Sequence, residues 1–457
     1  MKYISTRGQA AAVDFVTACL SGLASDGGLY VPEDWPRIAP AASDEPYISV
    51  AARILSAFAG DAMTYDDVKG LCGRAYDNFS HHSVAPIVQD GANSFRMDLH
   101  HGPTLAFKDV AMQVIAQLYD FVLKARGERM TIVCATSGDT GGAAAAAFAG
   151  ASQVDLFILH PYERVSPVQR LFMTTTGAKN VHNLAVDGDF DDCQTIVKAM
   201  FADRDFVKEV RLSGVNSINW ARISAQSVYY ATAQAALGPD RPVRFVVPSG
   251  NMGDALAGYV AARCGLLKGF EVVCAVNENR SLAELFESGI MKRTSAVATP
   301  SPAMDISVPS NFERLLFEVS GRDSDALRNI YGQYKQAGEA ELPNQIRGPL
   351  GCTGFSARSV SNAETEVEIL RYLDQTGELI CPHTAVGTKV AYDLPDTDAA
   401  TVVLATAHPA KFPETVKAAT GRDVPLPKRC RDLQQSGEVF EQIANDLALV
   451  KARVRKA

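Results

Sequence analysis

The chain has 457 residues, of which 47% are hydrophobic and 21% are charged. This length allows roughly three domains, and the composition is that of an ordinary soluble globular protein. The formal net charge of -8 comes from 44 basic and 52 acidic residues with no run of like charge, which argues against nucleic acid or an anionic membrane as a partner.

The cysteines and the N-terminal sequence indicate a compartment. Nine cysteines are scattered along the chain and never form a C-x-x-C pair, so free thiols fit better than disulfides or a zinc site. The first residues lack the apolar core of a signal peptide and the character of a transit peptide. No apolar stretch approaches the roughly 20 residues of a membrane helix. We therefore expect a cytoplasmic protein.

Residues 1–92 are expected to form a mainly helical N-terminal cover domain. Apolar residues recur at helical spacing over three stretches, 9–23, 47–58 and 65–76. The segment carries no chemical motif. Its histidines, and those just beyond it, lack a third metal ligand at usable spacing, so we expect loop or capping roles for two adjacent pairs, His81 with His82 and His100 with His101.

The stretch HGPTLAFKDVAMQ, residues 101–113, is expected to begin a helix from Leu105 to about Lys124. Thr104 is placed to accept a bond from a free N–H of its first turn. At about 100° per residue, one arc is polar and holds Asp109, Gln113, Gln117, Asp120 and Lys124. Lys108 falls in the opposite, apolar stripe, with Ala111, Met112, Ile115, Tyr119 and Val122.

A lysine on an apolar face must reach water, lose its charge or have a bonding partner. Desolvation favours the neutral amine, which is the form that attacks an aldehyde to make a Schiff base. The alternative is that Lys108 lies near enough to the helix start to reach round it into water. The rest of the chain favours the first interpretation.

A strand is expected over residues 130–135, followed by the loop TSGDTGG and an alanine-rich helix over 143–151. In this arrangement the free N–H groups of the helix N-terminus face an anion. The alternative is that Ser137, Asp139 or Thr140 merely caps the helix. Strands expected at 154–159 and 183–186, and a helix at 190–201, continue an alternation typical of a mostly parallel sheet.

The pattern recurs after a polar helix entry, NSINWAR, that gathers Asn216, Ser217, Asn219 and Arg222. A strand at 243–247 leads into the loop PSGNMGD and a helix over 255–266, and the next strand is expected at 271–276. Two polar glycine loops between apolar strands and alanine-rich helices are more specific than one glycine motif. The alternative for GNMGD is a tight turn with Gly250 and Gly253 at positive φ.

The remaining chain completes the expected organisation. A helical insertion spans about 280–375, a strand at 401–405 ends at Thr406, and a surface helix occupies 426–457. We expect a smaller α/β domain over 93–235 and a larger one over 236–425. Ligands bind beyond the carboxyl ends of strands in open α/β sheets, so the loops 136–140 and 249–254 and the residue Thr406 are expected to meet in one crevice.

The lysine on the apolar helical face, the glycine loop and the hydroxyl-bearing loop together match the needs of pyridoxal 5'-phosphate. The cofactor requires an amine for its aldehyde and a cradle of backbone donors for its phosphate, and its amino-acid substrates require donors for their carboxylate. Lys108, the glycine loop and the hydroxyl-bearing loop supply groups of these kinds.

Six ordered motifs, HGPTLAFKD, SGDTGG, NSINWAR, SGNMGD, PHTAVG and ATAHPAKF, together with MKYISTRG and GGLYVPEDWP, resemble the bacterial and fungal threonine synthase family. The resemblance covers nearly the whole chain and departs at Met252, where many relatives carry Phe. It implies the fold-type-II α/β architecture of pyridoxal-phosphate enzymes, tryptophan synthase β-like, with mostly parallel sheets covered by helices on both faces. It also implies a lyase that converts O-phospho-L-homoserine and water to L-threonine and phosphate.

The resemblance also implies roles for residues. Lys108 is the catalytic residue and bonds covalently to the cofactor, Asp139 lies beside the cofactor ring hydroxyl, and Thr406 faces the pyridine nitrogen. The cofactor phosphate is bound by the loop residues Ser249, Gly250, Asn251, Met252, Gly253 and Asp254. Substrate is bound through its carboxylate by Thr136, Ser137 and Thr140, and through its phosphate by Asn216, Ser217 and Arg222. We expect Lys411 to add positive charge and His160, His383 and His408 to be structural, with no metal.

Two other functions remain open at this stage. A serine or threonine dehydratase would share the lysine and the glycine loop but would not use the Arg222 cluster. A non-catalytic nucleotide-binding protein would use the two helix N-termini, but no G-x-x-x-x-G-K-[ST] stretch supports it, and it leaves Lys108 unexplained. The only partner we expect is the small-molecule substrate O-phospho-L-homoserine. We expect the protein itself to be a monomer or homodimer.

Overall fold

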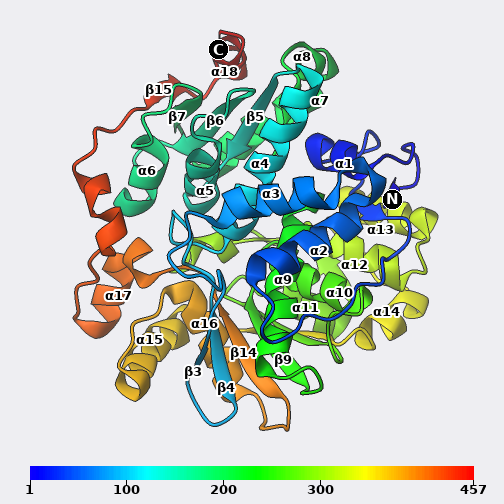
Figure 1. Ribbon diagram of the computed structural model, residues 1–457, viewed down its shortest axis with the longest axis vertical. Coiled ribbons are helices and arrows are strands. Elements are labelled where there is room, and N and C mark those ends of the chain that lie inside the picture. The colour runs from blue at the N-terminus through cyan, green and yellow to red at the C-terminus, as the bar shows by residue number, and fades with distance from the viewer. Residues whose placement is uncertain (457) are drawn as a thin grey trace.

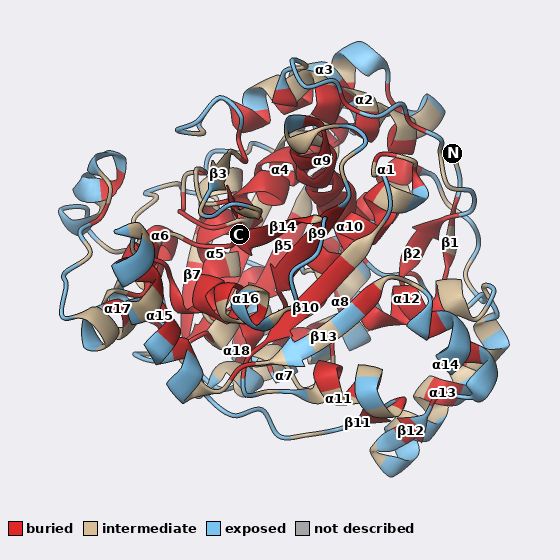
Figure 2. Ribbon diagram, turned by 90° about the horizontal axis from the view of Figure 1, so that it is seen from below, coloured by how far each residue is buried: buried red, intermediate tan, exposed pale blue. Residues whose placement is uncertain are grey.

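The computed structural model describes residues 1–456. It contains two open sheets with helices packed on and between them, and the sheets lie toward opposite ends of the view in Figure 1. The central strands of both sheets lie in the buried interior, and exposed residues are concentrated on the peripheral helices, loops and edge strands (Figure 2). This confirms the expected α/β architecture.

The larger sheet has six strands, of which five are parallel and the edge strand β3 is antiparallel. Its order is β13 (Phe355–Ser359), β10 (Glu271–Val276), β9 (Val243–Pro248), β14 (Ala400–Ala405), β4 (Ser94–Asp98) and β3 (Ile87–Gln89). Strand β9 reads VRFVVP and is buried throughout, as expected for a central parallel strand with both faces covered.

The smaller sheet has five parallel strands. Its order is β15 (Glu441–Ala444), β7 (Val181–Asp187), β6 (Val154–Pro161), β5 (Met130–Ala135) and β8 (Leu212–Ser213). Parallel neighbours require crossover connections, and helices supply most of them: α5 (Asp139–Phe148) joins β5 to β6, and α6 (Pro167–Thr174) joins β6 to β7. The carboxyl end of β5 therefore leads directly into a helix N-terminus.

The N-terminal helices share a hydrophobic core with the helices that carry the candidate site. Those helices are α1 (Phe15–Ser21), α2 (Tyr47–Ala59) and α3 (Tyr65–Tyr76), and they pack against α4 (Lys108–Arg126) and α9 (Trp220–Leu237). Trp220 lies at the centre, with its ring 5.8 Å from Tyr3 and 5.6 Å from Phe58. The N-terminal segment thus packs against the first residue of α9.

The other elements surround the two sheets. Helices α7 (Phe190–Ala202), α8 (Arg204–Glu209) and α18 (Leu447–Val454) lie beside the smaller sheet, while α10 (Gly253–Arg263) packs on α9. The remaining helices, most of them in the expected insertion, are α11 (Ser281–Ser288), α12 (Phe312–Val319), α13 (Ser324–Ala337), α14 (Asn344–Gly351), α15 (Asn362–Thr376), α16 (Pro382–Asp393) and α17 (Pro413–Thr420). Two short antiparallel pairs join β1 (Tyr3–Ser5) to β2 (Tyr30–Pro32) and β11 (Ile290–Lys292) to β12 (Glu339–Glu341).

Capping residues explain where α1 and α9 begin. The Asp14 side chain accepts a bond from the N–H of Thr17 at 2.7 Å, so α1 begins at Phe15 and not near residue 9. The Asn219 side chain accepts a bond from the N–H of Ala221 at 2.9 Å and starts α9. A side chain that accepts a bond from the first turn fixes the helix start more strongly than helical periodicity does.

Three strands correct the expected organisation. Strand β4 belongs to the larger sheet, although the division at residue 93 assigned it to the smaller domain. Strand β13 lies inside the expected helical insertion and returns to the larger sheet beside β10. The final segment is not one helix, because β15 pairs with β7 before the short helix α18 begins.

No helix within residues 1–456 has the length and apolar character that crossing a membrane requires.

Candidate functional site

Lys108 is the first residue of α4, three residues later than expected. Thr104 does not cap the helix: its hydroxyl donates to Asp109 Oδ1 at 2.6 Å, and its N–H donates to Asp109 Oδ2 at 2.8 Å. Leu105 adopts a left-handed conformation, with φ of 62°. Such a backbone is uncommon for a non-glycine residue and persists only where neighbours hold it. The bonds between Thr104 and Asp109 therefore help to hold the loop before Lys108 in this conformation.

The Lys108 side chain is buried, as its place in the apolar stripe indicates, and it does not reach round the helix into water. Its Nζ lies 3.3 Å from Asp139 Oδ2 and 4.8 Å from the centre of the Phe107 ring. Burial lowers the pKa of Lys108, with Arg222 and Lys411 acting in the same direction and Asp139 opposing them. The site thus favours the neutral, nucleophilic amine.

Asp139 lies between two lysines. Its Oδ1 is 2.9 Å from Lys411 Nζ and also accepts a bond of 2.9 Å from Gln169 Nε2. Burial would raise the pKa of Asp139, but the charges of Lys411 and Lys108 hold it well below its usual range. Asp139 is therefore a charged carboxylate inside the protein. Sequence reasoning assigned Lys411 only a general positive charge and gave Gln169 no role.

The loop after β5 is capped by a residue that sequence reasoning did not choose as the cap. Thr136 Oγ1 accepts bonds from the N–H groups of Gly138 at 2.9 Å and Gly141 at 3.0 Å. Ser137, Asp139 and Thr140, which the alternative interpretation made capping residues, make no side-chain cap bond to α5. Their side chains are left to line the cavity described below.

The loop after β9 also differs from the tight turn considered for it. Neither Gly250 nor Gly253 has positive φ; Met252 is the left-handed residue, with φ of 59°, and it immediately precedes α10. The loop is held by Ser310, whose hydroxyl donates to Asn251 Oδ1 at 2.7 Å, and by Asn311, whose N–H donates to the Asn251 carbonyl at 3.1 Å. Backbone N–H groups at the start of α10 are thus presented as an anion cradle.

Gly250 is required for space. A Cβ added there would lie 2.8 Å from the carbonyl oxygen of Ala303 and 3.0 Å from Ile306 Cγ1. We expect Gly250→Ala to lower the free energy of unfolding by about 1–3 kcal/mol, the usual cost of overpacking. The matched control is Gly332→Ala in α13, where a Cβ meets nothing within 4 Å and a gain of about 0.5–1 kcal/mol is expected. Denaturant titration measures both, and equal effects would contradict the assignment.

Arg222 and Asp254 form the polar floor beside this loop. Arg222 is 3% exposed, and its Nε has no hydrogen-bond partner within residues 1–456. Burial lowers its pKa to about 10. Asp254 Oδ1 accepts bonds from the hydroxyls of Tyr229 and Tyr230, while its Oδ2 has no partner in the described chain. A buried cation with an unpaired donor is prepared for an anion from outside.

The Asp254 carboxyl predicts a pH dependence of stability. Burial raises its pKa from 3.8 to about 6, against the bonds from Tyr229 and Tyr230. The folded chain thus binds this proton more tightly, and the contribution of Asp254 to stability falls as pH rises from about 4 to 6. At 1.36 kcal/mol per unit, we expect the stability of Asp254→Asn relative to the parent chain to rise by roughly 3 kcal/mol over that range. Cofactor-free protein unfolded at several pH values tests this; a constant difference would contradict it.

One cavity of about 910 Å³ brings the predicted residues together. All fifteen line it: Lys108, Thr136, Ser137, Asp139, Thr140, Asn216, Ser217, Arg222, Ser249, Gly250, Asn251, Met252, Gly253, Asp254 and Thr406. They come from both sheets, because the carboxyl ends of β5, β9 and β14 meet there. Sequence reasoning missed other residues that line the cavity, among them Gln194 and Lys198 on α7 and Arg293 after β11. Those residues carry no local motif that could have identified them.

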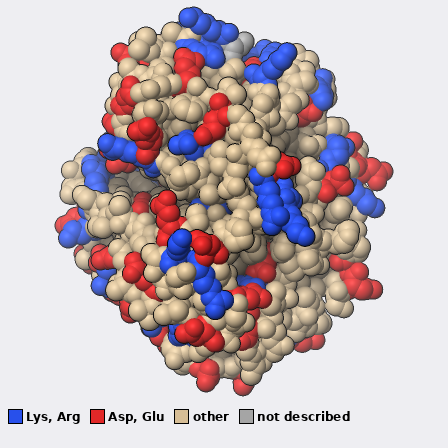
Figure 3. Space-filling model, turned by 90° about the vertical axis from the view of Figure 1, so that its left-hand side faces the viewer, with Lys and Arg blue, Asp and Glu red and all other residues tan. Residues whose placement is uncertain are grey.

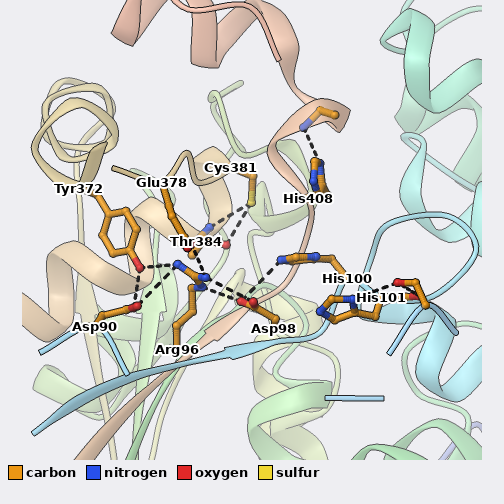
Figure 4. A network of polar contacts seen from close by, with 12 residues as sticks. Asp90, Arg96, Asp98, His100, His101, Tyr372, Glu378, Cys381, Thr384 and His408 are labelled. Atoms are coloured by element: carbon orange, nitrogen blue, oxygen red, sulfur yellow. Dashed lines mark hydrogen bonds and ion pairs between the residues drawn. The ribbon is translucent and has the colours of Figure 1, made fainter. Parts of the chain in front are cut away.

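The histidines make different polar contacts. Among residues 1–456 no group of three His, Cys, Asp or Glu residues could hold a metal ion. Figure 4 shows His100 directed at Asp98, the last residue of β4, which is 3.6 Å away and lies beside the buried Arg96. His408 accepts a bond from the N–H of Ala410. His383, expected to be structural, also lines the cavity, where its Nε2 accepts the N–H of Ala303 at 3.2 Å.

Three family models match the chain. The model described as "Threonine synthase N terminus" covers residues 2–76, and "Threonine synthase, C-terminal" covers 384–454. Between them, "Pyridoxal-phosphate dependent enzyme" covers residues 89–333, which is more than half of the chain. The matches include the helix that begins with Lys108 and the glycine loop.

Known proteins of similar sequence and structure agree with these models. A threonine synthase of Pseudomonas aeruginosa is 44% identical over 461 residues, covering 99% of this chain and 98% of that protein. The structure of pyridoxal-phosphate-bound threonine synthase from Brucella melitensis superposes with a TM-score of 0.96 at 48% identity, covering 100% of this chain and 99% of that one. Yeast threonine synthase gives a TM-score of 0.92 at 36% identity, with 100% and 98% covered.

Proposed function

The chain belongs to the threonine synthase family, and from this premise we propose that it converts O-phospho-L-homoserine and water to L-threonine and phosphate. It is a pyridoxal-phosphate-dependent lyase, and the reaction is the last step of threonine biosynthesis. The observation that carries the proposal for this cavity is the pairing of a buried amine, Lys108, with a buried guanidinium, Arg222, whose Nε has no partner within residues 1–456. The substrate has a phosphate for the second group, which a dehydratase substrate lacks.

The cavity residues fit pyridoxal phosphate. Ser249 Oγ is buried without a partner in residues 1–456, and Gly250 leaves no room for a Cβ against Ala303. Both observations are expected where a backbone cradle closes round a ligand phosphate. When bound, the cofactor supplies an electron sink that stabilises negative charge on the substrate α carbon.

The following residues would hold the cofactor. Lys108 Nζ would bond to its aldehyde, and Asp139 would interact with its ring hydroxyl. Its phosphate would be held by Ser249, Gly250, Asn251, Met252, Gly253 and Asp254, with the dipole of α10 in support. Thr406 would interact with the pyridine nitrogen, and its neutral hydroxyl would leave that nitrogen less firmly protonated than a carboxylate would.

Substrate is assigned to the two remaining parts of the cavity. Thr136, Ser137 and Thr140 hold its carboxylate at the start of α5. Asn216, Ser217 and Arg222 hold its phosphate, for which the planar guanidinium offers a fork of donors. Lys108 Nζ, freed when substrate binds, would remove the α proton and deliver it to the cofactor, which returns the amine to its neutral form. The same amine would then remove a β proton as the γ-phosphate departs. Water would add its hydroxyl at the β carbon, and protons would be returned to the α and γ carbons. An amine whose pKa is lowered by burial suits these transfers near neutral pH.

A substrate comparison tests the function. The cofactor-loaded chain is incubated with O-phospho-L-homoserine and, separately, with L-serine and L-threonine. We expect L-threonine and phosphate in equal amounts from the first and little 2-oxo acid from the others. Faster deamination of L-threonine than release of phosphate would favour the dehydratase alternative.

The finer organisation is proposed with the function. We place the protein in the cytoplasm, as a monomer or homodimer without a nucleic-acid or membrane partner. All nine cysteines are unpaired within residues 1–456, and Figure 3 shows acidic and basic side chains interspersed on the face it views. The proposed units are 1–92, 93–235, 236–425 and 426–457, with β3 and β4 contributing to the sheet of the larger α/β unit and β15 to that of the smaller one.

A further inference from the structure

Lys411 is completely buried next to the amine that the proposed function uses. Its Nζ lies 2.9 Å from Asp139 Oδ1 and donates to the Thr104 carbonyl at 2.8 Å. Its side chain is 0% exposed, against 10% for Lys108. Lysines are almost never fully buried unless paired, so the position calls for an explanation.

The segment that carries Lys411 is fastened to the loop that carries Lys108. The N–H of Phe107 donates to the Thr406 carbonyl at 2.8 Å, and the N–H of His408 donates to the Leu105 carbonyl at 3.0 Å. With the Lys411 bond to Thr104, three bonds join the two segments. Lys411 therefore cannot move relative to Lys108 without breaking this connection.

The charges near Asp139 are unequal. Two ammonium groups share one carboxylate, and Lys411 makes the shorter contact, 2.9 Å against 3.3 Å for Lys108. Lys411 also has the Thr104 carbonyl as a second partner. Because a buried surplus cation is costly, the less compensated amine is the one that loses its proton.

We propose that Lys411 is a positioning residue, which balances the charge of Asp139 and so leaves Lys108 as the amine that gives up its proton to solvent in the cavity. This inference rests on the proposed function, because it concerns the amine that bonds to the cofactor. Lys411 does not line the cavity and acts through Asp139.

The other charged and titratable groups around Lys108 cannot balance the charge of Asp139 in place of Lys411. Arg222 on α9 acts on Lys108 in the same direction as Lys411, while Asp254 on α10 is bonded to two tyrosines. His383 on α16 has its pKa lowered to about 3 by burial and is neutral near pH 7. Asp139 is thus the carboxylate in contact with Lys108, and what balances Asp139 decides the charge of Lys108.

The test is a pH titration of the visible absorbance of the cofactor-loaded, full-length chain. In Lys411→Met the Asp139 carboxylate has only the Lys108 nitrogen as a counter-ion. We therefore expect the midpoint of the absorbance titration, the pH at which this nitrogen is half protonated, to rise by about one pH unit or more. In Asp139→Asn both cations lose their counter-ion, and the midpoint should fall. Lys417→Met is the matched control: Lys417 is 60% exposed and pairs with Asp423, so its midpoint should stay unchanged.

A second measurement covers loss of the cofactor by a variant. The cofactor-free chain is methylated at several pH values with formaldehyde and cyanoborohydride as the hydride donor. The extent of labelling of Lys108, read by mass spectrometry, follows the fraction of that amine which is neutral. The same directions are expected. Unchanged midpoints in both Lys411→Met and Asp139→Asn, with the cofactor still on Lys108, would overturn the inference alone. A cofactor bonded to another lysine would instead overturn the proposed site.

Discussion

Lys108→Ala is expected to lower kcat for threonine formation by at least about a thousandfold, because one side chain supplies both the covalent attachment and the proton transfers. The variant should still fold. Lys108 makes one ion pair, at 3.3 Å, and Lys411 remains as a counter-ion for Asp139. Phosphate release and threonine production are measured with saturating pyridoxal phosphate.

The control for this prediction lies on the same helix. Lys124 is 55% exposed and pairs with Asp120 at the surface, so Lys124→Ala should retain nearly full activity. Added methylamine should partly restore Lys108→Ala, since it replaces the missing amine. Substantial activity in Lys108→Ala without added amine would contradict the assignment of this residue.

Arg222→Leu is expected to separate activity from stability. Loss of a buried charged partner costs about 2–5 kcal/mol of binding, which corresponds to a fall in kcat/KM for O-phospho-L-homoserine of roughly thirtyfold to several thousandfold. The cofactor-free variant should be at least as stable as the parent, because burial already disfavours the Arg222 charge and its Nε lacks a partner within residues 1–456.

Steady-state kinetics and thermal unfolding test both parts of this prediction. Arg222→Lys keeps a charge but loses the planar fork and should recover only part of kcat/KM. An unaltered kcat/KM in Arg222→Leu would remove the substrate phosphate from this position. A large loss of stability would show instead that Arg222 serves the fold.

Periodicity predicted elements that are apolar and regular. The ends of α3, β5 and β10 are where the sequence pattern placed them, because each contains a clear alternation of buried and polar positions or a continuous apolar run. The two glycine loops were correctly placed at the carboxyl ends of strands, and this was enough to predict one crevice.

Strands with polar or exposed residues were not predicted. In β4, Arg96 and Asp98 are buried and resemble loop residues, yet they compensate each other at 2.6 Å. In β15 only Ile443 is buried, so no alternation shows. Their pairings depend on partners far along the chain, and a single stretch of sequence does not report those partners.

The sequence also did not predict which residues of the site loops have a left-handed backbone. Two of the left-handed non-glycine residues, Leu105 and Met252, lie in the loops of the site. The Leu105 carbonyl accepts a bond from the N–H of His408, and Asn251, next to Met252, accepts one from the N–H of Asn311. Lys411 follows the same rule, because its importance comes from Asp139 and Thr104 in space. Sequence motifs gathered the cavity residues, but the charge balance among them appears only in the fold.

The most direct test of the account is to locate the bond between protein and cofactor. The full-length chain is loaded with pyridoxal phosphate, reduced with borohydride, digested and mapped by mass spectrometry. We expect the reduced cofactor on Lys108, with loss of the visible absorbance band. The cofactor on any other lysine, Lys411 included, or an absence of covalent attachment, would contradict the central claim that the buried amine of α4 holds the cofactor.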